Sequence, residues 1–150
     1  MNDIKQNANN KKLVVIDSSV TVKWVNRKEE EFLSQADLIL KDVEKGKIHI
    51  LMPELGKYEV GNALLNKGSE PALITLALEK FYDIPIQFVS EDLELAQSAI
   101  ETARRYKITY YDASFISLAE KLHADLVTNN PKHQKKKIAG LKVISLKDYR

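Results

Sequence analysis

Short apolar runs alternate with longer helical patterns along the whole chain, and this alternation limits the possible folds more than any other feature. Strands are predicted where the runs are short and apolar, at residues 13–17, 48–52, 84–89, 125–128 and 141–146. Strands that are joined by helices form a mainly parallel sheet with helices on both faces. We therefore expect an α/β fold with three α/β/α layers and a central sheet of about four or five short strands.

Capping residues and prolines mark the ends of the expected helices, which cover residues 18–25, 29–45, 53–66, 71–82, 91–106 and 112–122. A short basic helix is also expected after Pro131. Three glutamates open the second helix, where the helix dipole favours negative charge. Pro53 and Pro71 begin the third and fourth helices, and Ser90 caps the fifth. Pro85 predicts that the third strand lies at an edge of the sheet, because proline cannot donate a ladder hydrogen bond.

Length and composition exclude several classes of protein. The 150 residues suffice for one domain, which we expect over residues 13–150 after a flexible polar tail at 1–12. The chain has no cysteine, which excludes disulfides, a thiolate nucleophile and cysteine zinc sites, and its three histidines are far apart. No apolar run approaches the ~18 residues of a membrane span, so we expect a cytoplasmic protein without a membrane partner.

Polar side chains gather where the expected strands end and the expected helices begin. They are Asp17 after the first strand, Glu59 and Asn62 in the third helix, Asp112 at the start of the sixth, and Thr128 and Asn130 after the fourth strand. The carboxyl ends of parallel strands share one edge of a sheet, and functional crevices lie there. We therefore expect these carboxylates and amides from distant segments to meet at one site.

Clustered carboxylates need a compensating charge. Two of them at about 5 Å repel by roughly 3 kcal/mol at an effective dielectric constant near 20. A bound cation removes this repulsion, and hard oxygen ligands without histidine or cysteine select Mg²⁺ or Mn²⁺. Each residue also has a plainer interpretation. Asp17 and Asp112 are also suited to helix capping, Glu59 to an exposed helix face, and residues 128–130 to a turn.

Three motifs in order carry a resemblance to a known family: VVIDSSVTVKW, PELGKYEVGNALL and ITYYDASFISLAEKLHADLVTNN. Together they resemble the PIN domain, and within it the VapC-like toxin ribonucleases of type II toxin–antitoxin pairs. The resemblance extends over about residues 13–146, and it implies a PIN-like nuclease domain. It also implies partners, namely an RNA substrate, a cognate antitoxin and a second copy of the chain in a homodimer.

The resemblance assigns roles to particular residues. It makes Asp17, Glu59 and Asp112 the catalytic and metal-binding acids, and it places Asn130 where the family usually has a fourth aspartate. Asp125 starts the same short strand and lies too far from its carboxyl end to replace that acid. The supporting residues are Ser18, Asn62 and Thr128.

The activity that follows is hydrolysis of RNA phosphodiester bonds by an endoribonuclease with Mg²⁺ or Mn²⁺ as cofactor. From residue 131 onward the chain has seven Lys or Arg residues and one acid. Four of these, Lys132, Lys135, Lys136 and Lys137, are candidates for contact with the RNA backbone. An alternative function is a PIN-fold RNA- or protein-binding module with weak or no catalysis, because Asn130 replaces an acid. Trp24 is expected in the core, whereas Tyr110 and Tyr111 are suited either to packing or to base stacking.

Overall fold

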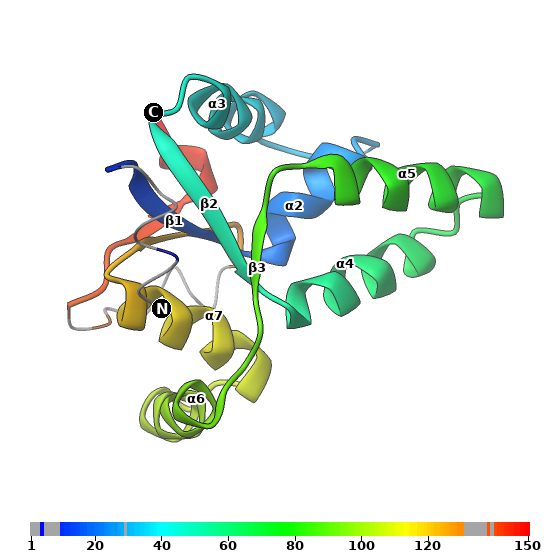
Figure 1. The fold of residues 1–150 in the computed structure, drawn as a ribbon. Coiled ribbons are helices and arrows are strands. Elements are labelled where there is room, and N and C mark those ends of the chain that lie inside the picture. The colour runs from blue at the N-terminus through cyan, green and yellow to red at the C-terminus, as the bar shows by residue number, and fades with distance from the viewer. Residues whose placement is uncertain (1–3, 5–9, 29, 131–137, 139) are drawn as a thin grey trace.

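The computed structural model describes residues 4, 10–28, 30–130, 138 and 140–150. Its strands are β1 (Lys12–Ile16), β2 (Ile48–Pro53), β3 (Gln87–Val89), β4 (Asp125–Thr128) and β5 (Val143–Ser145). Its helices are α2 (Ser18–Val25), α3 (Leu33–Glu44), α4 (Leu55–Asn66), α5 (Pro71–Asp83), α6 (Leu93–Tyr106) and α7 (Tyr110–Leu122), with a short 3₁₀ helix η1 (Leu146–Asp148). Strands and helices alternate as expected (Figure 1).

The five strands form one sheet in the order β3-β2-β1-β4-β5, and every neighbouring pair is parallel. The first strand lies in the middle of the sheet because its β-branched residues are buried on both faces; Val15 and Ile16 are fully buried. The strand with Pro85 just before it, β3, lies at an edge, as predicted. The predicted α/β class with a mainly parallel sheet is thus confirmed.

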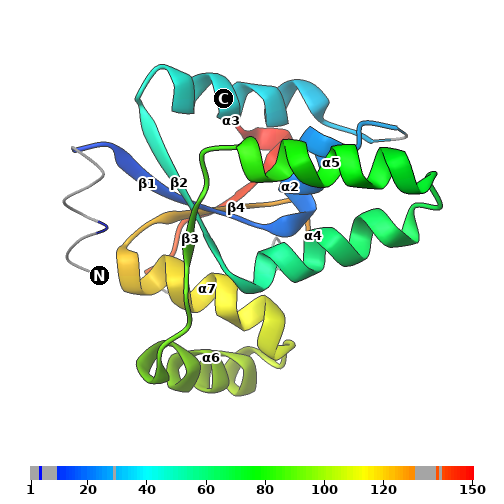
Figure 2. The same ribbon diagram turned by 45° about the vertical axis from the view of Figure 1, so that its right-hand side comes forward.

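Helices cover both faces of the sheet and complete the three layers (Figures 1 and 2). Helices α6 and α7 lie on one side, and α2 and α3 lie on the other. Helices α4 and α5 form a hairpin that extends away from the sheet beyond α2. Trp24 is buried in the core, where its indole N–H donates to the carbonyl of Ala36 at 2.8 Å, so its predicted core position is confirmed.

The start predicted for the second helix is wrong. Helix α3 begins at Leu33, and Phe32 before it adopts a left-handed conformation with φ of 58°. Glu30 lies outside the helix and forms ion pairs with Lys23 on α2 and Lys67 after α4. This pairing across elements replaces the interaction with a helix dipole that the glutamate run predicts.

Two further helix starts differ from the predictions. Pro53 is the last residue of β2, and α4 begins two residues later at Leu55. Helix α6 is capped by Asp92, whose carboxylate accepts from the Leu95 N–H at 2.8 Å. The Ser90 hydroxyl donates instead to Glu54, at 2.9 Å, and so links the end of β3 to the start of α4.

The division of the chain into a tail and a domain stays a prediction. Within the segment 1–12, the described residues include Ile4, which is buried, and Lys12, which begins β1. The basic helix expected after Pro131 lies outside the described residues. None of the helices that the structure describes combines the length and apolar character needed to cross a membrane.

Candidate active site

Asp17 follows the central strand and lies 4% exposed at the carboxyl edge of the sheet. Its backbone begins α2, since its carbonyl accepts from Val20 N–H at 3.0 Å, but its side chain makes no capping hydrogen bond to the helix. The carboxylate instead accepts hydrogen bonds from the hydroxyls of Ser19 at 2.6 Å and Thr128 at 2.7 Å. Helix capping by the Asp17 side chain is therefore wrong, and the carboxylate is held at the junction of β1 and β4.

Glu59 reaches the same edge from the second turn of α4. The hydroxyl of Ser18 contacts its carboxylate at 2.5 Å and also lies 3.5 Å from the carboxylate of Asp17. Both contacts share the Ser18 hydroxyl oxygen. The contacted carboxylate oxygens of Glu59 and Asp17 are therefore no farther apart than the sum of the two distances. Glu59 is half-buried, and its interpretation as an exposed helix residue is wrong.

Asp112 joins the site through Asn130. Helix α7 begins before Asp112 and is capped by Thr109, whose hydroxyl accepts from the Asp112 N–H at 3.0 Å, so Asp112 is not the helix cap. The Asn130 amide donates to the Asp112 carboxylate at 3.3 Å. The Asn130 backbone N–H donates to the buried Thr128 hydroxyl at 2.9 Å, and that hydroxyl in turn contacts Asp17.

These contacts form a continuous hydrogen-bonded series from α4 to α7 across the ends of β1 and β4. We call the side chains of Asp17, Glu59, Asp112 and Asn130 the acidic cluster. The structure brings together all four predicted catalytic residues, with Ser18 and Thr128 between them. It does not bring in Asn62, which is exposed one turn after Glu59 on α4.

The acidic cluster lies within a part of the chain that matches a known protein family. The model of the PIN domain matches residues 14–139, which is most of the chain and includes the whole acidic cluster.

The chain belongs to the PIN domain family.

Solved structures with the same fold are distant in sequence from this PIN domain. VapBC2 from Rickettsia felis, bound to a DNA fragment of its promoter, is 17% identical with a TM-score of 0.65, covering 89% of this chain and 98% of that one. PAE2754 from Pyrobaculum aerophilum is 21% identical with a TM-score of 0.63, covering 91% and 90%. VapC20 from Mycobacterium tuberculosis, a Sarcin-Ricin loop cleaving toxin, is 12% identical with a TM-score of 0.62, covering 83% and 96%. No curated protein matches the chain.

The donor chemistry of the acidic cluster fits a hard divalent cation. Carboxylate oxygens dominate it, and Mg²⁺ is usually held by one or two carboxylates while it keeps several waters. As the side chains are placed, no three His, Cys, Asp or Glu residues of the described part form a ready ligand set. The Ser18 hydroxyl lies between Glu59 and Asp17, and the Asn130 amide lies against Asp112. The three-carboxylate metal site therefore stays a prediction.

The sequence prediction missed Ser19 as a part of this site. Its hydroxyl donates to Asp17 and accepts from the backbone N–H of Asn129 at 3.0 Å, so it joins the start of α2 to the chain after β4. The only available signal was the hydroxyl pair that follows Asp17. The predicted RNA-binding residues Lys132, Lys135, Lys136 and Lys137 lie outside the described residues.

The two neighbouring tyrosines of α7 have different environments. Tyr110 is half-buried, and burial together with a hydrogen bond to Glu91 raises its pKa to about 12. Tyr111 is 58% exposed. Packing thus accounts for Tyr110, whereas Tyr111 is open to solvent beside Asp112.

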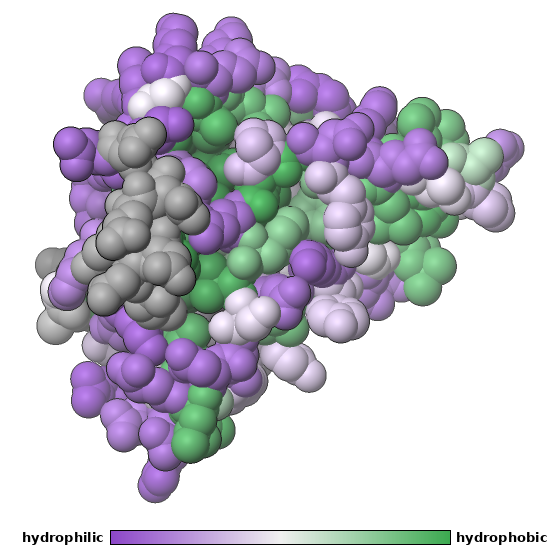
Figure 3. All heavy atoms as spheres, in the orientation of Figure 1, coloured by the Kyte–Doolittle hydropathy of each residue, from purple (hydrophilic) through white to green (hydrophobic). Residues whose placement is uncertain are grey.

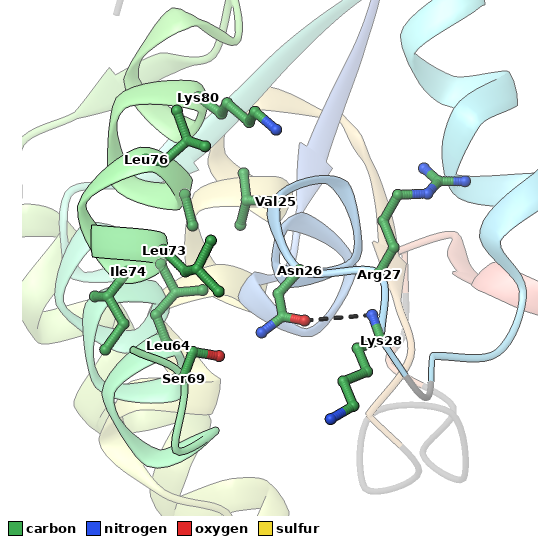
Figure 4. A pocket seen from close by; sticks show the side chains of 11 residues that line it. Val25, Asn26, Arg27, Lys28, Leu64, Ser69, Leu73, Ile74, Leu76 and Lys80 are labelled. Carbon is green, nitrogen blue, oxygen red and sulfur yellow. Dashed lines mark hydrogen bonds between the residues drawn. The ribbon is translucent and has the colours of Figure 1, made fainter. Parts of the chain in front are cut away.

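Two pockets of this PIN domain lie away from the acidic cluster. One, of about 640 Å³, is at the amino ends of the strands, where Asp125 pairs with Lys12 at 2.6 Å and Asp42 pairs with Lys47 at 2.9 Å. Asp125 is therefore at the opposite edge from Asn130, as predicted. The other, of about 270 Å³, lies between the end of α2 and the α4–α5 hairpin (Figure 4).

Proposed function

We propose that this PIN domain is a metal-dependent endoribonuclease in which Asp17, Glu59 and Asp112 hold Mg²⁺ or Mn²⁺. One observation carries the proposal. Hydrogen bonds connect acids from three segments, with Asn130 from a fourth, at the carboxyl edge of a parallel sheet. Residues that serve only as caps or as solvated surface have no reason to converge in this way.

The surrounding residues fix the acids in place. Ser19 and Thr128 donate to the same oxygen of Asp17 and hold its carboxylate in one orientation. Ser18 sets the position of Glu59, and Asn130 donates to Asp112. When bound, the cation would lower the pKa of a water ligand and offset charge on the phosphate. The described donors are hydroxyl and amide groups, which orient the carboxylate oxygens that would hold the cation.

Cleavage of a labelled RNA tests the proposal. We expect cleavage with Mg²⁺ or Mn²⁺, no cleavage with EDTA, and loss of cleavage in Asp17→Ala. The matched control is Asp37→Ala, which removes an exposed aspartate that pairs with Arg27, beyond the C-terminal end of α2. Activity that persists in EDTA, or Asp17→Ala with an undiminished rate, would contradict the proposal.

We also propose that the chain is the toxin of a toxin–antitoxin pair, acts in the cytoplasm, and forms a homodimer. The support is its likeness to chains solved in VapBC complexes. Figure 3 shows hydrophobic residues on the surface over the α4–α5 hairpin, where Leu65, Leu73 and Leu76 are exposed. The test is to co-purify the chain with the product of a small neighbouring reading frame, measure inhibition of cleavage, and determine the mass in solution.

A second function is favoured by one observation, the amide at position 130. If the missing acid abolishes cleavage, the domain binds RNA or a protein without hydrolysing it. Asn130→Asp distinguishes the two functions. A large rise in cleavage rate would support the binding module, and an unchanged rate would show that three carboxylates suffice.

A further inference from the structure

Three tyrosines are strongly exposed in the described part of the chain: Tyr58 at 77%, Tyr82 at 61% and Tyr111 at 58%. Two of them directly precede an acid of the cluster, since Tyr58 is followed by Glu59 and Tyr111 by Asp112. Large aromatic rings usually lose much of their surface on folding. Both rings therefore belong to the helices that carry the two outer acids, and both remain mostly exposed.

On α4, the surface around Tyr58 is open. Gly61 lies one turn further along the same face, and nothing comes within 4 Å of the position where a side chain would begin. Asn62, four residues after Tyr58, is exposed, so an amide group with two donors and an acceptor lies beside the ring. This face of α4 thus offers a flat aromatic surface, free space and hydrogen-bonding groups.

On α7, Tyr111 lies in the first turn, at the opposite end of the acidic cluster. The beginnings of α4 and α7 face each other across the carboxyl edge of the sheet (Figures 1 and 2). Hydrogen bonds fix both helices to that edge, from Ser18 to Glu59 on one side and from Asn130 to Asp112 on the other. The two exposed rings therefore lie on elements that flank the cluster from its two sides.

We propose that Tyr58 and Tyr111 stack on unpaired RNA bases on the two sides of the phosphodiester held at the acidic cluster. The inference rests on the proposed function and names the residues that select the substrate. Every base has a π face, so stacking tolerates different sequences. A ring can stack on a base only where that base is free of its helix, so the pair selects single-stranded or looped RNA.

Binding measured without cleavage tests this inference. The probe is a fluorescent single-stranded RNA of about a dozen nucleotides and mixed sequence, in EDTA, followed by anisotropy. We expect Tyr58→Ala and Tyr111→Ala each to weaken binding by about 5- to 150-fold. Tyr58→Phe and Tyr111→Phe keep the ring and should bind like the wild type. Tyr82→Ala removes an equally exposed ring from the end of α5 and is the matched control.

The outcomes separate this inference from the proposed nuclease activity. Alanine variants that bind the single strand as tightly as the wild type, or a duplex probe that binds as tightly as the single strand, would overturn the stacking role. Phenylalanine variants as weak as the alanine variants would also overturn it. A wild-type chain that binds RNA through these rings but does not cleave it with Mg²⁺ would support the inference and contradict the nuclease proposal.

Discussion

The two edges of the sheet both carry aspartates, but they hold them differently. At the amino edge, Asp42 and Asp125 are contacted by the ammonium groups of Lys47, Lys12 and Lys142. At the carboxyl edge, Asp17, Glu59 and Asp112 accept hydrogen bonds from Ser and Thr hydroxyls and from the Asn130 amide.

This difference separates stability from function. A lysine ammonium group compensates the negative charge of a carboxylate in the folded protein. This contact increases the free energy of unfolding. A hydroxyl contact orients a carboxylate. The amino edge is therefore expected to stabilise the fold, whereas under the proposed function the carboxyl edge binds a cation. Variants at the amino edge should change the melting temperature, whereas variants at the carboxyl edge should change the RNA cleavage rate.

The largest effect is expected for Asp17→Asn at the carboxyl edge. The amide keeps the size of the side chain and can still accept from Ser19 and Thr128, but it removes the charge that holds the cation. We expect a loss of about a thousandfold in the RNA cleavage rate, which is about 4 kcal/mol in the activation free energy. The melting temperature should change little, because the amide oxygen keeps the hydrogen bonds from Ser19 and Thr128.

The matched variant at the amino edge is Asp125→Asn, whose side chain is 13% exposed between Lys12 and Lys142. It should lower the melting temperature and leave the cleavage rate of the folded protein unchanged. The division between the edges would fail if Asp17→Asn unfolded the chain or if Asp125→Asn abolished cleavage.

The next effect is expected for Asn130→Asp in the absence of metal. It replaces a donor 3.3 Å from the Asp112 carboxylate with a second carboxylate. Repulsion at this distance is about 5 kcal/mol at an effective dielectric constant of 20, and relaxation of the half-buried pair should leave about 2 kcal/mol of destabilisation. Differential scanning calorimetry should show a lower melting temperature in EDTA and recovery with Mg²⁺. Equal melting temperatures with and without Mg²⁺ would count against a cation site here.

Helix α4 positions Glu59 through its contact with β2, and Gly56→Ala perturbs that contact. A methyl group at Gly56 would overlap the side chain of Met52, which is fully buried. We expect a destabilisation of about 1–3 kcal/mol together with a lower cleavage rate, because α4 must shift away from the sheet. Gly61→Ala on the open face of the same helix is the control and should stabilise by about 0.5–1 kcal/mol. Equal urea denaturation midpoints for the two variants would contradict the packing described for α4.

The smallest effect is expected for Asp42→Asn at the amino edge. Its pKa is lowered by the hydrogen bond from Lys47, against the effect of burial, and by the hydroxyl of Tyr149. A lowered folded-state pKa gives stability that is present above the unfolded pKa near 4 and is lost as pH falls through the folded value. Asp42→Asn should therefore cost about 1 kcal/mol at pH 7, and the cost should fall as the pH drops through the folded-state pKa. A cost that is independent of pH would exclude this ion pair as its cause.

The sequence predicted the fold well because the alternation of strands and helices is a local property. The β-branched run before Asp17 and the periodicity of the helices are enough to place β1 and its crossovers. Helix starts were predicted less well, since Glu30 pairs with Lys23 and Lys67, which are remote in the chain. Such pairing is decided by the packing of α2 against α4, and no local pattern contains it.

The sequence predicted which residues belong to the site but not the hydrogen bonds that connect them. The rule about carboxyl ends and the family motifs placed Asp17, Glu59 and Asp112 together. The bridging role of Ser18 depends on side-chain orientation across the gap between α2 and α4, so the sequence could not show it. The sequence also could not show that Asn62 is exposed, because spacing along a helix does not determine which side of α4 faces the acidic cluster.

A crystal of the protein soaked with Mn²⁺ tests the central claim most directly, through its anomalous difference map. We expect a peak within about 2.5 Å of carboxylate oxygens of Asp17 and of at least one of Glu59 and Asp112. A preparation that cleaves RNA but shows no manganese among these oxygens, or shows it only beside Asp42 and Asp125, would contradict it.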